Sequence, residues 1–324
     1  MTTVFLDRNV RQSQARAARF IIDHLFDGNP LIIGGATGRT QRGIYECLFS
    51  MAHEREISFR NASALFLDEY VNGGYATYRL YAMQHLRAGK PEGFREENVY
   101  VPRGCFFEND RPVSSDRLSE ILNESTGEWE AMSESGDDGA EIFIHPHATH
   151  PVLRAIRQCN LRYDEKLQTI GKERLQLLGI GRQGHLAFVE AGTARSDGDT
   201  MLVRLADTTC RDNDSDFNLR DGDDNEIKIA SSRFAISQGI RSILSAGKLI
   251  LSAHGASKCA AVKEMLLTPP SPQNPAGYVT THPFASIFLD FDAWGDLNTA
   301  ECRERGFHVV SFSDARSAES LCSE

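Results

Sequence analysis

Short apolar runs recur along this chain, and stretches with helical spacing separate them. The runs lie at 30–35, 64–70, 175–181, 248–255, 286–291 and 308–313. Runs of this length without polar alternation are typical of strands buried on both faces, as in parallel sheets. The helix-like stretches lie at 40–53, 153–170 and 257–267. This alternation predicts an α/β fold with one doubly wound, mostly parallel sheet flanked by helices, in a Rossmann-like arrangement.

The start of the chain and two later segments set the expected domain organisation. A first helix is predicted before the first core strand, from the spacing of Ala15, Ala18, Ile21, Ile22, Leu25 and Phe26. Segments 103–150 and 193–230 are acidic and do not follow the alternation of strand and helix. We interpret 1–324 as a single domain in which 103–150 is an insertion and 193–230 is a mobile lid. A solvated loop is the alternative for the most acidic part, 207–226.

Charge and cysteine spacing argue against several classes of protein. A net charge of −10 disfavours binding to nucleic acid or to an anionic membrane, because both need a cationic surface. Seven cysteines without CxxC spacing indicate neither a disulfide framework nor a zinc site. Asp7, Arg8 and Arg11 interrupt the apolar core that a signal peptide would need, and no run of 18 apolar residues occurs. We therefore expect a cytoplasmic enzyme without a metal.

The first apolar run ends in a glycine-rich turn, Gly34–Thr40, directly before a predicted helix. Ligands of open parallel sheets bind where strand ends meet helix N-termini. The backbone N–H groups, hydroxyls and guanidinium of this turn predict a phosphate cradle. Its residues are Gly35, Thr37, Gly38, Arg39 and Thr40. The turn lacks the Gly-Lys-Ser/Thr ending of a Walker loop, so no nucleotide is implied, and a turn that only packs helix on strand is the alternative.

Two carboxylates stand together at the end of the second apolar run. Asp68 and Glu69 follow a stretch in which loss of solvent would raise a carboxyl pKa towards that of a general base. Successive side chains of a strand point to opposite faces, so only one of the two can face a cleft directly. The other is expected to bind backbone or solvent. A helix cap or turn residue is the structural alternative for an aspartate in this position.

A histidine and a glutamate follow the third apolar run. His185 and Glu190 lie five residues apart, and Gly184 permits close approach of a substrate. The two side chains are suited to acid and base catalysis, and a buried structural histidine is the alternative.

Further cationic and imidazole groups follow later in the chain. Arg233 is predicted to begin a helix over 233–244, from which its guanidinium could bind an anion. His254 and Lys258 come directly after the fourth apolar run, in a helix-start geometry at the same edge of the sheet. We interpret these last two residues as structural.

In order along the chain, these blocks resemble the glucosamine-6-phosphate deaminase family. The matching segments are GGATGRT, FLDEY, YDEKL, LGIGRQGHLAFVEAG, RFAISQGI, HGASK and THP, which extend over about 1–292. The DEY and GxGHxAFxE blocks are the most specific. The resemblance implies an enzyme that converts an amino-sugar phosphate, glucosamine 6-phosphate or an epimer, to a ketose 6-phosphate and ammonia without a cofactor.

The resemblance also implies roles for individual residues. Asp68 stands where the family has the base that moves a proton between C2 and C1, and His185 stands where it has the acid and base of ring opening. Glu190 matches the carboxylate that orients this histidine. The implied substrate- and phosphate-binding residues are Gly35, Thr37, Gly38, Arg39, Thr40, Glu69, Gly184, Arg211 and Arg233. The family's lid arginine aligns with Cys210 or Arg211, and Arg211 is chosen because its side chain can bind phosphate.

Two positions depart from the family, since Gln183 replaces a usual aspartate and Val189 a usual asparagine. Glutamine carries no charge, so we expect a lower pKa for His185 than in the family and count Gln183 with the catalytic residues.

A 6-phosphogluconolactonase-like hydrolase is an alternative function that the DEY block and Glu190 disfavour. A catalytically silent sugar-phosphate-binding protein is another, disfavoured because the start of the chain shows no helix-turn-helix. A homo-oligomer is left open.

Overall fold

The computed structural model describes residues 1–23, 31–71, 77–132, 139–195, 197–213, 219–220, 226–227 and 232–311. Its largest sheet has eight strands in the order β17-β1-β16-β15-β10-β2-β3-β5, and all neighbours are parallel. The strands are β1 (Thr3–Asp7), β2 (Ile32–Gly35), β3 (Ser63–Phe66), β5 (Val99–Tyr100), β10 (Leu175–Leu178), β15 (Lys248–Ala253), β16 (Ala285–Asp290) and β17 (His308–Ser311). The predicted parallel α/β sheet is confirmed.

The chain reverses its winding direction between β2 and β10. After β2 it adds β3 and β5 on one side, and after β10 it adds β15 and β16 on the other. The two strands approach closely because Gly34 of β2 lies opposite Gln176 of β10. A Cβ on Gly34 would stand 2.2 Å from the side-chain oxygen of Gln176. The sheet is therefore doubly wound, and its switch point lies at the carboxyl ends of β2 and β10.

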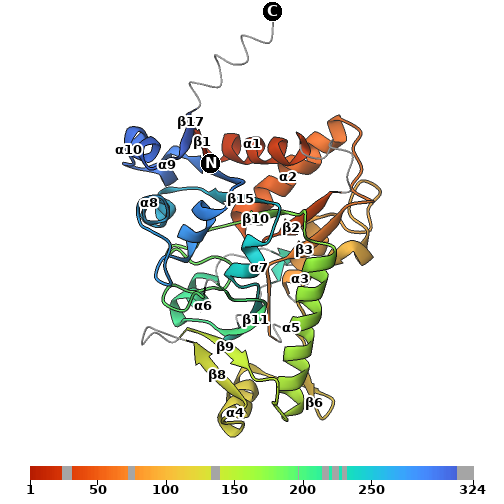
Figure 1. Cartoon of the computed structure of the whole chain (residues 1–324). Coiled ribbons are helices and arrows are strands. Elements are labelled where there is room, and N and C mark those ends of the chain that lie inside the picture. Colours follow the sequence, from red (N-terminus) through yellow and green to blue (C-terminus); the bar gives the residue numbers. More distant parts are fainter. Residues whose placement is uncertain are drawn as a thin grey trace, which may run out of the picture.

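Helices surround the strands (Figure 1). They are α1 (Val10–Asp23), α2 (Arg39–Glu54), α3 (Tyr78–His85), α4 (Ser115–Glu124), α5 (Pro151–Thr169), α6 (Asp207–Asn213), α7 (Ile240–Leu244), α8 (Cys259–Leu267), α9 (Phe291–Trp294) and α10 (Thr299–Glu304), with 3₁₀ turns at Glu96–Asn98, Ala256–Lys258 and Pro275–Thr281. In α1 the buried Ala17, Ala18, Ile21 and Ile22 recur at helical spacing and form one apolar stripe. Of the predicted helices, the first one and those at 40–53, 153–170 and 257–267 are confirmed within a few residues at their described ends.

A second, antiparallel sheet has the order β4-β14-β11-β9-β8. Its strands are β4 (Asp68–Tyr70), β14 (Phe234–Ser237), β11 (Met201–Arg204), β9 (Ala140–Ile144) and β8 (Trp129–Met132). In Figure 1, β8 and β9 lie at the opposite end of the molecule from α1, and α5 runs from that end towards the large sheet. Side chains of this sheet, including Leu202 and Ile236, form a separate apolar cluster with Leu118 of α4 and Ile156 of α5.

The apolar run 64–70 is two strands rather than the single predicted strand. β3 ends at Phe66 in the parallel sheet, and β4 begins at Asp68 in the antiparallel sheet. The link between them is fixed because the Leu67 N–H donates to the Gly35 carbonyl over 3.1 Å, and the Gln238 N–H donates to the Leu67 carbonyl over 2.8 Å. The hydrophobic pattern misses this change because every residue from Ala64 to Tyr70 is buried, on both sides of the break between the strands.

Two further predictions about the elements are wrong. Arg233 precedes the strand β14 and not a helix, because Phe234–Ser237 are all buried between β4 and β11, where strand pairing satisfies their backbone. The helix in this stretch, α7, begins only at Ile240. The first core strand is β1 rather than the run 30–35, and it precedes the first helix. β1 lies inside the sheet between β16 and β17.

Segment 103–150 contributes to the fold through the short strands β6 (Phe107–Glu108) and β7 (Arg111–Pro112), through α4, and through β8 and β9. Segment 193–230 contains β11, an internal strand of the second sheet, then α6 and the strands β12 (Leu219–Arg220) and β13 (Glu226–Ile227). Of the segment that we predict to be a lid, residues 196, 214–218, 221–225 and 228–230 lie outside the described part of the chain. No helix in the described part of the chain is both long and apolar enough to span a membrane.

Candidate active site

A cavity of about 460 Å³ opens at the carboxyl ends of β2 and β10, and we call it the switch-point cavity. Its lining comes from loops 36–41, 179–188 and 252–258, together with Asp68 and Tyr78. These are the loops that follow β2, β10 and β15, so the cavity occupies the place that a doubly wound sheet offers to ligands.

Buried polar atoms without a hydrogen-bond partner gather at this cavity. Within the described part of the chain these atoms are Asp7 Oδ2, Gln41 Nε2, Asp68 Oδ1, Glu141 Oε2, Asn160 Oδ1, His185 Nδ1, Ser252 Oγ and His254 Nδ1. The residues among them that line the switch-point cavity are Gln41, Asp68, His185, Ser252 and His254. An unsatisfied buried polar group costs about 1–3 kcal/mol, so a cluster of them indicates a site that is completed by a polar ligand.

Asp68 and Glu69 point to different surroundings. Asp68 lines the cavity, where burial and then the charge of Glu69 raise the pKa of its carboxyl well above the usual value. Glu69 instead accepts hydrogen bonds from the backbone N–H groups of Tyr70, Tyr78 and Arg79 and so caps the start of α3. Burial raises the pKa of Glu69 to about 7. Asp68 is therefore the carboxylate that can meet a ligand.

His185 is held at the cavity wall by a glycine. A Cβ on Gly181 would lie 2.3 Å from the His185 ring, so only glycine leaves room for the imidazole there. The turn also uses Gly184 at a φ of 79°, which favours glycine. His185 Nδ1 lies 3.8 Å from Glu190 Oε2, which is too long for a hydrogen bond. Burial, followed by the charge of Lys258, lowers the pKa of His185 to about 4, so the imidazole is neutral near pH 7.

The loop after β2 presents an open helix N-terminus to the cavity. α2 begins at Arg39, and its N-cap residue Gly38 has a φ of 111° and provides no side-chain cap. The loop is supported from behind, because the Tyr81 hydroxyl donates to the Gly38 carbonyl over 2.8 Å and the Ala36 N–H donates to the Tyr45 hydroxyl over 3.1 Å. The first N–H groups of α2 are thus directed to a site that suits an anion.

Three cationic side chains line the switch-point cavity: Arg39, Arg182 and Lys258. Sequence reasoning proposed Arg39, passed over Arg182 and interpreted Lys258 as structural, together with His254. The signal for Lys258 and His254 was the His-Gly-Ala-Ser-Lys segment after a buried strand. The sequence does not show that this segment reaches the cavity, because that depends on the position of β15 next to β10 in the sheet.

Several predicted site residues do not line the cavity. Gln183 is exposed and accepts a hydrogen bond of 3.5 Å from the Thr208 hydroxyl. Arg233 is 56% exposed and forms an ion pair of 2.7 Å with Asp207. Arg211 is exposed on α6. The remaining four that do not line it are Gly35, Glu69, Gly184 and Glu190. A Cβ on Gly35 would meet the Phe66 ring at 2.6 Å.

Comparisons with known proteins give both a curated relative and solved structures. No family model matches the chain. The glucosamine-6-phosphate deaminase of Hahella chejuensis is 30% identical over 273 residues, which are 84% of this chain and 83% of that protein. A solved monomeric glucosamine-6-phosphate deaminase has a TM-score of 0.66 at 23% identity, over 90% of this chain and 98% of that one. The solved 6-phosphogluconolactonase of Trypanosoma brucei has a TM-score of 0.54 at 15% identity, over 92% and 99%.

Proposed function

The chain belongs to the glucosamine-6-phosphate deaminase family, and on this basis we propose that it converts glucosamine 6-phosphate, or an epimer, to the ketose 6-phosphate and ammonia. One observation carries the proposal. Asp68 and His185 each hold an unpartnered buried polar atom at one cavity, beside the uncapped N-terminus of α2. A base, a neutral imidazole and an anion site are the three parts that this reaction on a sugar phosphate requires.

In the proposed mechanism His185 opens the sugar ring. Its neutral imidazole takes the proton of the C1 hydroxyl and returns a proton to the ring oxygen. The carboxylate of Asp68 then removes the proton from C2, and an enolamine forms. Asp68 returns that proton to C1, water adds to C2, and ammonia leaves to give the ketose phosphate. Burial in the cavity raises the pKa of Asp68. A raised pKa suits a carboxyl group that first accepts a proton and then returns it.

The phosphate is proposed to bind at the start of α2. The N–H groups of Gly38–Thr40 and the hydroxyl of Thr37 would receive it, as the resemblance implies. The cavity-lining Arg39 and Lys258 would supply positive charge. Arg211 and Arg233 are further proposed contacts, and measurement of KM for an Arg233→Ala variant tests whether Arg233 takes part.

The test is to incubate the purified protein with glucosamine 6-phosphate, galactosamine 6-phosphate and 6-phosphogluconolactone. Ammonia, ketose phosphate and acid are measured in each case. Ammonia and ketose phosphate in equal amounts from an amino sugar are the expected result. Acid release from the lactone alone would instead identify a lactonase, and binding without any product would identify a sugar-phosphate-binding protein.

We also propose a cytoplasmic location, supported by the cysteines of the described residues, which include no disulfide. The related deaminase of known structure is described as monomeric. Light scattering of the purified chain separates a monomer from a homo-oligomer.

A further inference from the structure

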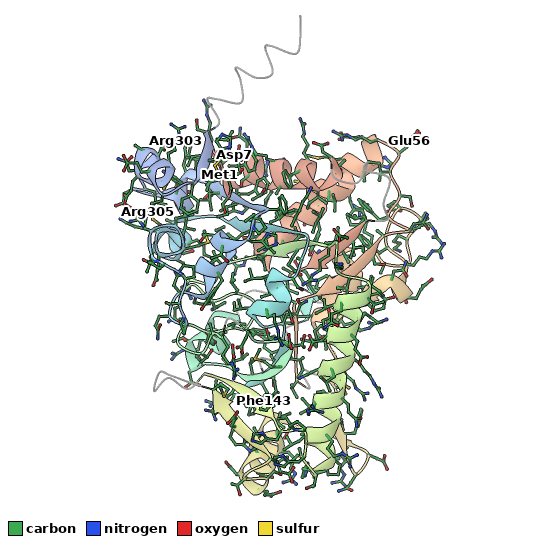
Figure 2. All side chains as sticks on the ribbon, in the orientation of Figure 1. Met1, Asp7, Glu56, Phe143, Arg303 and Arg305 are labelled. Carbon is green, nitrogen blue, oxygen red and sulfur yellow. The ribbon has the colours of Figure 1, made fainter. Side chains whose placement is uncertain are left out.

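A second cavity, of about 380 Å³, lies between α5, β9 and the segment 195–201, and we call it the α5 cavity. It shares no lining residue with the switch-point cavity. The strands β9 and β11 pair only as far as Ile142 and Leu202, and beyond these residues both strand ends line the cavity. Figure 2 labels Phe143 of β9 in this part of the molecule.

The α5 cavity holds two more of the unpartnered buried polar atoms. They are Oε2 of Glu141, which is 1% exposed, and Oδ1 of Asn160, which is 8% exposed. Oε1 of Glu141 accepts a hydrogen bond from the Arg195 N–H, so only its second oxygen lacks a partner. Asn160 Oδ1 is a hydrogen-bond acceptor, and so is Glu141 Oε2 in the carboxylate form, so a ligand that satisfies both atoms carries donors and binds the ionised Glu141.

The charges of the lining also favour a cation. Acidic residues exceed arginines there, with Glu130, Glu141, Asp164, Asp197 and Asp199 against Arg157, Arg195 and Arg241. Arg195 is paired with Asp197, and Arg241 is paired with Asp199. Asp164 accepts hydrogen bonds from Thr200 and Ser242. With the two ion pairs neutralised, the carboxyl groups of Glu130, Glu141 and Asp164 remain beside Arg157, and Glu141 adds its negative charge once it is ionised.

The rim of the α5 cavity is apolar. Phe143 is 46% exposed and Leu161 is 45% exposed, and both line the opening. Met132 and Met201 add further apolar surface. A ligand with an apolar body would cover these side chains while its donor group reaches the buried acceptors.

We propose that the α5 cavity binds a small organic amine, whose ammonium group donates hydrogen bonds to Glu141 and Asn160 and whose apolar part covers Phe143 and Leu161. The proposal does not depend on the proposed deaminase activity. Burial raises the pKa of Glu141 to about 8, so most of this carboxyl group is protonated at neutral pH before a ligand binds. The arriving ammonium favours the carboxylate form, and the displaced proton passes to the solvent. The groups that face Glu141 are Arg195 and Asp197.

The test is isothermal titration of the full chain with n-hexylamine hydrochloride, 1-hexanol and hexanoate, three probes with one apolar chain and different head groups. We expect one bound hexylamine, at least about tenfold tighter than the other two, because only its head group makes charge-assisted hydrogen bonds to the acceptors. Titration in buffers of different ionisation enthalpy should show proton release. Hexanoate binding as tightly as hexylamine would overturn the proposal.

Variants locate the site. Glu141→Gln should weaken hexylamine about tenfold or more, whereas Glu165→Gln, an exposed carboxylate on the same helix α5 as Asn160, should change nothing. Leu161→Lys is a rim variant that spares the fold, and its charge should weaken binding about threefold or more. Asp68→Asn should leave the affinity unchanged. Undiminished binding to Glu141→Gln and Leu161→Lys, or loss of binding to Asp68→Asn, would show that the amine binds elsewhere.

Discussion

Asp68 and Glu69 are neighbours in the sequence, but their side chains have different surroundings in the fold. The Glu69 carboxylate accepts hydrogen bonds from three backbone N–H groups at and near the start of α3. Asp68 instead has one carboxyl oxygen without a hydrogen-bond partner at the switch-point cavity. His185 depends in the same way on one neighbour, Gly181, that leaves space for its ring. At the scale of single residues, the site therefore consists of the buried polar atoms that have no hydrogen-bond partner in the folded chain.

Replacement of Asp68 by Asn should abolish deaminase turnover, because the amide cannot accept the C2 proton. Binding of a non-reactive substrate analogue should stay within about tenfold, since the side chain acts in proton transfer more than in binding. Steady-state kinetics and analogue titration measure the two effects separately. Near-normal kcat in this variant would remove Asp68 from the mechanism.

Lys258→Met should have two effects. Removal of its charge should raise the pKa of His185, which this charge now lowers, so the acidic limb of the kcat/KM profile should move to higher pH. KM should rise about tenfold or more, because a charge-assisted contact to phosphate is worth about 1.5–3 kcal/mol. Lys263→Met, which removes an exposed lysine of α8, is the control, and an acidic limb that does not move in Lys258→Met would contradict the assignment.

At the scale of elements, the break between β3 and β4 decides where Asp68 points. The side chain of Gln238, which is fully buried, donates to the Phe66 carbonyl over 3.0 Å and accepts a hydrogen bond of 3.3 Å from Arg174. The Tyr163 hydroxyl donates to the same carbonyl. A buried polar network thus anchors the last residue of β3, two positions before Asp68.

Gln238→Leu should therefore affect both stability and catalysis. The variant leaves Arg174 with one acceptor fewer in the core, which should lower the free energy of unfolding by about 1–3 kcal/mol. Displacement of Asp68 should lower kcat about tenfold or more, while KM changes little because the start of α2 is not touched. Chemical denaturation and steady-state kinetics test this against the exposed control Gln168→Leu. A loss of stability with unchanged kcat would show that the network does not position Asp68.

At the scale of the whole molecule, two sheets share one chain and each is associated with a cavity. The parallel sheet provides the loops of the switch-point cavity, and the antiparallel sheet provides much of the α5 cavity. Their strands meet at β4, which carries Asp68 at the edge of the antiparallel sheet. Buried carboxyl groups in both cavities link the global stability to pH.

Glu141 makes this link measurable. Its folded pKa is raised from 4.5 to about 8, so its contribution to stability is fully present below pH 4.5 and is lost as the pH rises towards 8. The free energy of unfolding of Glu141→Gln, relative to the unchanged chain, should rise over this range by on the order of 3–5 kcal/mol. Denaturation series at several pH values measure it, with Glu165→Gln as control. Parallel curves for the two proteins would contradict the raised pKa.

The sequence by itself determined the parallel sheet and many of the cavity residues. Buried apolar runs separated by helical stretches favour parallel strands, because the helices that connect such strands cover the sheet on both faces. The glycine-rich turn at 34–40, Asp68 and His185 follow three of these runs, and parallel strands bring their carboxyl ends to one edge. Local pattern was enough for these features, and the family resemblance pointed to the same residues.

Only the tertiary structure decided the rest, because it depends on contacts between residues far apart in the sequence. β4 differs from β3 only through its pairing with β14, more than 160 residues later, and no local pattern encodes that partner. Lys258 reaches the cavity because β15 lies beside β10, while Arg233 is turned to Asp207 outside the cavity. Glu141 and Asn160 became a candidate site only when folding buried them without partners. Burial and satisfaction of a polar atom are properties of the packed chain, so they could not be derived from the sequence.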